Sequence, residues 1–202
     1  MGLHEPAWWA WPEHYERLDV LYMRAFLPLY CRKASHFFPW SHFTVAENRK
    51  HLGLPFTDVT VTYAAPSPYF HPIDDRAALD AWRERHHLPE RFVLVVTRVD
   101  HPGLDRSTSF YPGKNVETAA RAFRLCRGRV PHQLVVAGRR VREYLVSRGW
   151  SEQDLEGIRF LGFVPHEELP MLYNLAELFV LPSYYESFAM TMVEAMACGC
   201  PV

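Results

Sequence analysis

The stretch "IRFLGFVPHEELPMLYNLAELFVLPSYYESFAMTMVEAMACGCPV", residues 158–202, decides the fold of this chain. It begins with a short apolar run at residues 158–164, and a helical pattern follows over residues 166–176. A second apolar run occupies residues 177–182, and a second helical pattern covers residues 189–199. This alternation of strand and helix predicts a parallel sheet with helices on both of its faces.

The same alternation extends upstream to residue 91. The strand-like runs are "RFVLVV" at residues 91–96 and "QLVVAG" at residues 133–138. Helical patterns follow them at residues 115–126 and 139–149. Because the strand runs are continuously apolar, the sheet should be buried on both faces. Four successive strand-helix units therefore predict an α/β domain over residues 91–202.

The first ninety residues have a different pattern. Residues 13–34 form a long amphipathic helical stretch. Thr44 and Glu47 have the spacing of a capping box, which predicts a helix over residues 45–54. Residues 58–63, "DVTVTY", alternate as a strand does. These elements include too few strands to close a domain by themselves.

The chain is therefore predicted to consist of three parts. Residues 1–63 are the remnant of a first domain, and residues 64–90 are a proline-rich connector with a helix. Residues 91–202 are the second domain, and its sheet should be incomplete at the C-terminal end.

Composition excludes several classes of function. The 202 residues carry 22 cationic against 23 anionic side chains, so the net charge of −1 gives no electrostatic case for binding nucleic acid. The 4 cysteines lack zinc-type spacing, and the 11 histidines are scattered, so surface histidines and no metal site are expected. Free thiols and the lack of a signal-peptide pattern predict a cytoplasmic location.

Two cations lie where a ligand would bind. In an open parallel sheet, ligands bind outside the carboxyl ends of the strands. Arg98 and Asp100 follow the strand at residues 91–96, and Lys114 precedes the next helix, for which Asn115 is the expected cap. A lysine is disfavoured at a helix N-terminus unless an anion binds there. Lys114 and Arg98 therefore either hold a phosphate or extend into water.

Two carboxylates are the other candidates. Glu186 and Glu194 have seven residues between them. If the helix begins near Ala189, Glu186 lies in the preceding loop and Glu194 lies about 8 Å along the helix axis. The backbone N–H groups of Phe188 and Ala189 would then lie between the two carboxylates, which suit the vicinal hydroxyls of a ribose or a hexose.

Each carboxylate also has a structural interpretation. Ser183 and Glu186 fit a capping box that would start the helix at Tyr184. Glu194 lies in a helix that is apolar nearly all round, so it should be largely buried. A buried carboxylate needs a donor, a cation or a place at the edge of a cleft.

These residues, in this order, resemble the donor-binding half of GT-B fold retaining glycosyltransferases, the large group called glycosyltransferase family four or glycosyl transferases group one. "VTRVD" (residues 96–100) and "PGKN" (residues 112–115) resemble its arginine and lysine pair. Residues 158–202 resemble its most specific segment, including the E-x-x-x-x-x-x-x-E signature. The resemblance covers roughly residues 35–202 and implies a Rossmann-like parallel sheet that binds a nucleotide sugar.

The resemblance implies a role for each candidate residue. Arg98 and Lys114 would hold the diphosphate and stabilise it as it leaves. Glu194 would bind the ribose, and Glu186 would face the transferred sugar. The loop that accompanies Glu186 is Ser187, Phe188 and Ala189, and the segment along the base is Gly162, Phe163 and Val164.

The implied activity is retaining transfer of a hexose from a UDP- or GDP-linked donor to a glycan, lipid-linked or small-molecule acceptor. The family typically needs no metal and no cofactor, because the two cations neutralise the diphosphate. Peripheral association with a membrane stays open. The alternatives are a non-catalytic nucleotide-binding module, in which Glu186 is dispensable, and a sugar-nucleotide epimerase.

The chain departs from the family pattern in two ways. The family's E-G-F-G loop is here Glu186-Ser187-Phe188-Ala189, which would be strained if either glycine position needs a positive φ. Most of the acceptor domain and the end of the donor domain are also missing. We therefore expect a fragment truncated at both ends, with weak or no transferase activity on its own.

Overall fold

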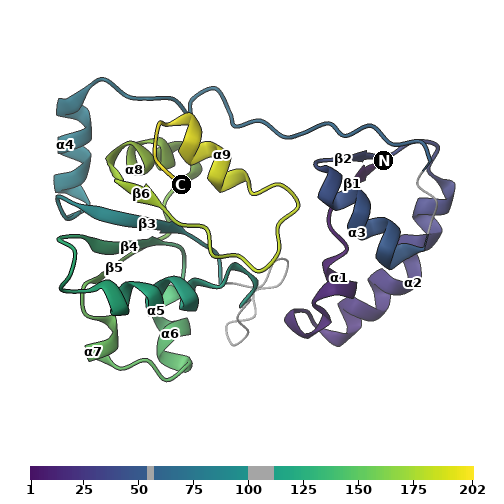
Figure 1. Ribbon diagram of the computed structural model, residues 1–202, viewed down its shortest axis with the longest axis horizontal. Helices are drawn as coiled ribbons and strands as arrows, with labels where there is room; N and C mark the ends of the chain where they lie inside the picture. The colour runs from purple at the N-terminus through teal and green to yellow at the C-terminus, as the bar shows by residue number, and fades with distance from the viewer. Residues whose placement is uncertain (54–56, 100–111) are drawn as a thin grey trace. The chain divides into compact units, whose positions relative to one another are not determined.

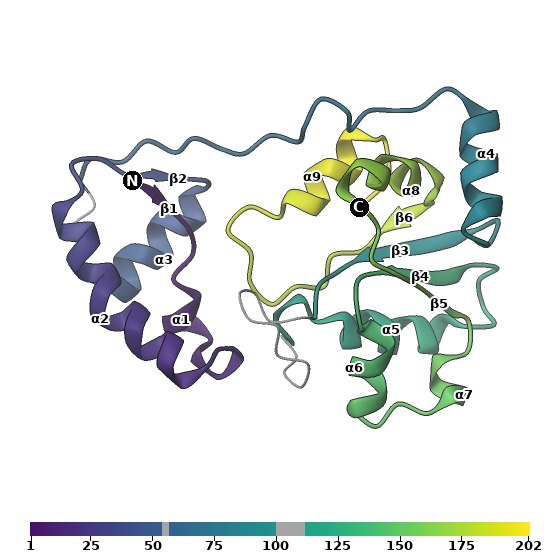
Figure 2. The same cartoon turned by 180° about the vertical axis from the view of Figure 1, so that it is seen from behind.

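The computed structural model describes residues 1–53, 57–99 and 112–202 (Figures 1 and 2). These residues form two compact units. The first unit is Met1–Ala65 with Tyr185–Ala189, and the second unit is Pro66–Tyr184 with Met190–Val202. This division differs from the predicted domains in two places. The predicted connector belongs to the second unit from Pro66 onward, and Tyr185–Ala189 belongs to the first unit.

The second unit is built on one parallel sheet. Its strand order is β5-β4-β3-β6, with bounds β3 (Phe92–Val96), β4 (Gln133–Ala137), β5 (Ile158–Gly162) and β6 (Leu178–Phe179). The three ladders are all parallel, which confirms the predicted α/β class. β6 is shorter than the apolar run that predicted it, because only Leu178 and Phe179 pair with β3.

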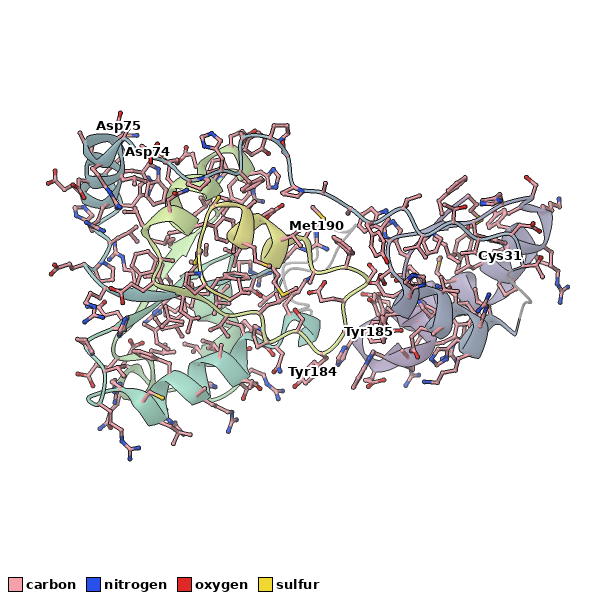
Figure 3. All side chains as sticks on the ribbon, turned by 45° about the horizontal axis from the view of Figure 1, so that its top comes forward. Cys31, Asp74, Asp75, Tyr184, Tyr185 and Met190 are labelled. Atoms are coloured by element: carbon pink, nitrogen blue, oxygen red, sulfur yellow. The ribbon has the colours of Figure 1, made fainter. Side chains whose placement is uncertain are left out.

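Helices cover both faces of this sheet (Figures 1 and 2). One face carries α4 (Arg76–Arg85), α8 (Leu169–Leu175) and α9 (Met190–Ala197), with the 3-10 turn η3 (His166–Glu168) leading into α8. The other face carries α5 (Val116–Cys126), α6 (Val141–Ser147) and α7 (Glu152–Leu155), with η2 (Pro112–Lys114) leading into α5. Asp75, labelled in Figure 3, caps α4 by accepting a hydrogen bond from the Ala78 N–H.

The alternation of side chains along the strands explains why the strand runs are apolar throughout. Phe92 and Leu94 of β3 pack into the core between the sheet and helices α4, α8 and α9. Val95 packs into the core between the sheet and helices α5 and α6. All three residues have no exposed surface. In β4, Val135 belongs to the first of these cores and Val136 to the second. Each strand therefore contributes buried side chains to both layers.

The described residues of the first unit form four helical segments and a two-stranded parallel sheet. The strands are β1 (Gly2–Leu3) and β2 (Phe38–Pro39). The helical segments are α1 (Ala7–Ala10), η1 (Pro12–His14), α2 (Arg17–Lys33) and α3 (His42–Leu52). Its buried cluster is small and centres on Leu3, Cys31 and Phe37. Across the described residues of both units, no helix combines the length and hydrophobicity needed to cross a bilayer.

The predicted capping box at Thr44 is wrong. Helix α3 begins at His42, and its cap is Ser41, whose hydroxyl accepts a hydrogen bond from the Thr44 N–H at 3.1 Å. Thr44 is thus already inside the first turn. Glu47 does not return to the cap but accepts hydrogen bonds from Lys50 and from the Tyr185 hydroxyl.

The strand predicted for residues 58–63 is also wrong. Val59 makes only an isolated bridge to Phe37, although the Thr60 and Thr62 N–H groups donate to the carbonyls of Phe37 and Pro39. Pro39 has no N–H to donate in return, so the ladder cannot continue along β2.

Candidate functional site

The segments that follow the four strands of the second unit meet at the carboxyl edge of the sheet. The ladder continues past the strand ends, because the Thr97 N–H donates to Ala137 O at 2.9 Å and the Gly138 N–H donates to Gly162 O at 2.7 Å. A Cβ added to Gly138 would lie 2.4 Å from Thr97 O, so only glycine permits this close approach. Hydrogen bonds therefore hold the backbone in place where the predicted site residues leave the sheet.

Lys114 lies at this edge in a segment that is tied to the one after β6. The Asn115 side-chain amide donates to Pro182 O at 2.9 Å, and the Tyr184 N–H donates to Gly113 O at 3.1 Å. These two bonds join stretches that are 67 residues apart at Asn115 and Pro182. They fix the backbone on both sides of Lys114, whose side chain is half-buried. Tyr184 is labelled in Figure 3.

The predicted cap at Asn115 has the right position but the wrong interaction. Asn115 is the residue before α5, yet its side chain does not cap the helix. Its backbone is left-handed, with φ 50°, and its Oδ1 accepts from the Thr118 hydroxyl at 2.8 Å. The side chain serves instead to hold the Pro182 carbonyl.

Arg98 follows β3 and is exposed. Its neighbour Val99 is 1% exposed and packs in the core of the α5 face, so the backbone that carries Arg98 is anchored from one side. Asp100, the next predicted residue of this loop, lies outside the described residues.

Glu194 is buried in α9, as predicted, with 4% of its surface exposed. Its two carboxylate oxygens have protein partners. Oε1 lies 3.1 Å from His166 Nε2, and Oε2 accepts from the Tyr173 hydroxyl at 3.4 Å. Burial, followed by the charge of Glu194, raises the pKa of Tyr173 well above its usual range, so its hydroxyl stays protonated as a donor. Glu194 therefore has local donors in this structure, which was one of the alternatives open from the sequence.

His166 contacts Glu194 at this edge of the sheet, and sequence reasoning did not single it out. It was grouped with the scattered surface histidines, although it lies just after β5, at the edge where a ligand was expected. The Tyr69 hydroxyl is hydrogen-bonded to Nδ1, and the Phe70 ring packs edge-on at 5.1 Å between centroids. Because the carboxylate of Glu194 can only accept, Nε2 carries the hydrogen that is donated to it.

The segment Gly162-Phe163-Val164 leaves β5 at the same edge. Gly162 has φ 70°, a left-handed conformation that favours glycine. Phe163 is 61% exposed, and the guanidinium of Arg139 lies 4.5 Å from the centre of its ring. Arg139 was not predicted, but it follows β4, whose neighbour in the sheet is β5.

The loop of residues 185–189 belongs to the first unit. Ser187 O accepts hydrogen bonds from the hydroxyls of Ser41 at 2.7 Å and Thr44 at 3.3 Å. Glu186, the second predicted carboxylate, is half-buried in this loop. The structure places Glu186 in one unit and Glu194 in the other.

Helix α9 begins at Met190, which confirms the start expected near Ala189 and makes the alternative capping box at Ser183 wrong. Ala189 has φ 64°, so this position does require the left-handed conformation. The condition for strain in the loop is therefore met at the second of the two glycine positions.

Comparisons with known proteins bear on the family and on the fold. Residues 107–202 match the family described as Glycosyl transferases group 1. This part of the chain belongs to that family. The O-antigen chain mannosyltransferase B of Escherichia coli is 29% identical over 206 residues, which are 98% of this chain and 50% of that protein. The alpha-D-kanosaminyltransferase of Streptomyces kanamyceticus is 32% identical over 77% of this chain and 38% of its own length.

Solved structures of glycosyltransferases and related synthases share the fold of this chain. Sucrose-phosphate synthase from Thermosynechococcus elongatus matches with a TM-score of 0.65 at 27% identity, over 92% of this chain and 43% of that one. Anabaena HepE, solved in complex with UDP-glucose, matches with a TM-score of 0.69 at 20% identity, over 100% of this chain and 51% of that one. The predicted GT-B fold is confirmed, and the chain spans between 38% and 51% of the length of these four proteins.

Proposed function

We propose that this chain is part of a glycosyltransferase that takes a nucleoside-diphosphate sugar as its donor. The observation that carries the proposal is the family match over residues 107–202, which includes Lys114, Glu186 and Glu194. The relatives named as a mannosyltransferase and a kanosaminyltransferase support transfer of a sugar. The HepE complex with UDP-glucose supports a nucleotide sugar as donor.

The donor would bind along the carboxyl edge of the sheet. Lys114 stands directly before the N-terminus of α5, where backbone N–H groups and the helix dipole favour a phosphate. Arg98 follows the adjacent β3 and would join Lys114 on the diphosphate. Phe163, exposed next to Gly162 and Val164, would lie along the base, and Glu194 would accept hydrogen bonds from the ribose.

The proposed reaction is transfer of a hexose with retention of configuration. The bond between the sugar carbon and the diphosphate oxygen breaks, and its electron pair leaves with the diphosphate, which Arg98 and Lys114 stabilise. The acceptor hydroxyl attacks from the same face and gives its proton to the departing diphosphate. Glu186 would face the sugar beside the N–H groups of Phe188 and Ala189, with Ser187 between.

The acceptor would be a glycan, a lipid-linked sugar or a small molecule, reached in the cytoplasm or at a membrane surface. No metal or cofactor is needed in this proposal, because the two cations neutralise the charge that develops on the diphosphate.

Calorimetric titration with UDP, GDP and ADP tests the donor site. Lys114→Ala should weaken binding of the preferred nucleotide by about 10- to 100-fold, because a charge-assisted contact is lost. Glu194→Ala should weaken it by a similar factor. Lys50→Ala is the matched control, since Lys50 is exposed on α3 and pairs with Glu47. Equal affinities for the Lys114 and Lys50 variants, or no binding of any nucleotide, would refute the proposal.

One observation favours a non-catalytic nucleotide-binding module as a second candidate. Ala189 occupies a left-handed position in the loop that would face the sugar, and a side chain there adds strain that glycine lacks. Such a module would bind the nucleotide without turnover, and Glu186→Ala would leave nucleotide affinity unchanged. Transfer of radiolabelled sugar from a donor panel to any acceptor would eliminate this candidate.

A further inference from the structure

The carboxylate proposed to bind the ribose is already occupied in the structure. Glu194 is 4% exposed, and His166 and Tyr173 take one oxygen each. A vicinal diol needs the same carboxylate to accept two new hydrogen bonds. Each oxygen can accept a second hydrogen bond, but the carboxylate is almost fully covered, so a ribose can reach it only if one of the present partners moves aside.

The two partners differ in their freedom to move. Tyr173 has no exposed surface and packs edge-on against Phe179 of the sheet, with ring centres 5.5 Å apart. The His166 side chain is 54% exposed and stands on a short 3-10 turn. Rotation of His166 into solvent would uncover Oε1 without disturbing the core. His166 is therefore the partner that can be displaced.

We propose that His166 is an affinity-determining gate for the nucleotide donor. In the free protein its Nε2–H takes the position on Glu194 that a ribose hydroxyl takes in the complex. Tyr69 holds the gate shut through its hydrogen bond to Nδ1, assisted by the edge-on contact of its ring at 5.7 Å. The proposal rests on the proposed function, since it concerns the same donor site.

Removing the gate should change the nucleotide affinity in the opposite direction from structural damage. A ligand that binds only the open state has its affinity reduced by the fraction of molecules that are open. One hydrogen bond to a charged group corresponds to a population ratio of about tenfold or more. Removing the imidazole should therefore tighten nucleotide binding, whereas loss of a mere structural contact should weaken it.

Calorimetry with UDP, GDP and ADP on a matched set of variants tests the gate. His166→Ala should tighten binding of the preferred nucleotide about tenfold. Tyr69→Phe, which keeps the ring but loses the hydroxyl, should tighten it by about threefold. His132→Ala is the control, because His132 also donates to a carboxylate, that of Glu177, but lies before β4 at the opposite edge of the sheet.

A second background separates the gate from other effects. With Glu194→Ala already present, removing His166 should give no further gain, because the contested carboxylate is absent. Suppose that the wild type binds nucleotide. If His166→Ala then binds it equally or more weakly, or if removing His166 still tightens binding in the Glu194→Ala background, the gate is overturned and the donor site is not. Lack of binding by both wild type and His166→Ala overturns the gate and the proposed donor site together.

Discussion

Replacing Ala189 by glycine should stabilise the protein, although most alanine-to-glycine changes do the opposite. Ala189 has φ 64°, and a left-handed backbone costs an L-residue about 1–2 kcal/mol. Glycine removes that cost but gains about 0.4–1 kcal/mol of chain freedom in the unfolded state. The net expectation is a gain of about 0.8 kcal/mol in the free energy of unfolding.

Urea denaturation of the wild type and two variants measures this effect. With a slope of about 2 kcal/mol per molar urea, Ala189→Gly should raise the midpoint by about 0.4 M. Ala46→Gly is the matched control, because Ala46 is exposed within α3 and Ala189 belongs to the same unit. Its midpoint should fall by about 0.5 M, since glycine in a helix costs about 1 kcal/mol.

The comparison of the two variants isolates the native backbone, because the unfolded chain gains the same freedom in both. If Ala189→Gly lowers the midpoint as much as Ala46→Gly does, the left-handed strain at Ala189 is absent and the reasoning fails. The second candidate function would then also lose its supporting observation.

Two further predictions concern the second unit. Gly138→Ala should lower the free energy of unfolding by about 2–3 kcal/mol, because its Cβ would lie 2.4 Å from Thr97 O. Gly128→Ala is strained by its φ of 83° but meets no atom within 4 Å, so it should cost less, and equal losses in urea melts would contradict this. Hydrogen bonds from Arg91 and then His132 lower the pKa of Glu177 from its ordinary 4.5 to about 2. The contribution of the Glu177 carboxylate to stability is therefore complete above pH 4.5 and is lost as the pH falls through about 2. Glu177→Gln should flatten the plot of unfolding free energy against pH in that window. Parallel plots for the wild type and the variant would show that the ionised Glu177 adds no stability.

The strands and helices of the second unit were predictable because their signals are local. Runs such as residues 91–96 are apolar enough to require burial on both faces, and the structure uses them so. The burial of Glu194 followed from its apolar neighbours in the same way. Local pattern and tertiary packing agree in these segments.

The errors have physical causes that a local pattern does not contain. Ser41 and Thr44 are both acceptable caps, and the choice between them depends on where the chain enters α3. The alternating run at residues 58–63 lacks a long partner strand, because β2 is two residues long and ends in Pro39. His166 was missed because its contact is with Glu194, which is 28 residues further along the chain.

The assignment of Tyr185–Ala189 to the first unit has a consequence for protein engineering. The polypeptide passes between the units at residues 65/66, 184/185 and 189/190, so neither unit is a contiguous cassette. A chimaera that grafts residues 66–202 onto the leading half of a homologue imports a foreign Ser187 carbonyl and Tyr185 hydroxyl. The recipient must then supply counterparts of Ser41 and Glu47. Without them, these two hydrogen bonds are lost even when the two sequences join smoothly at residue 66.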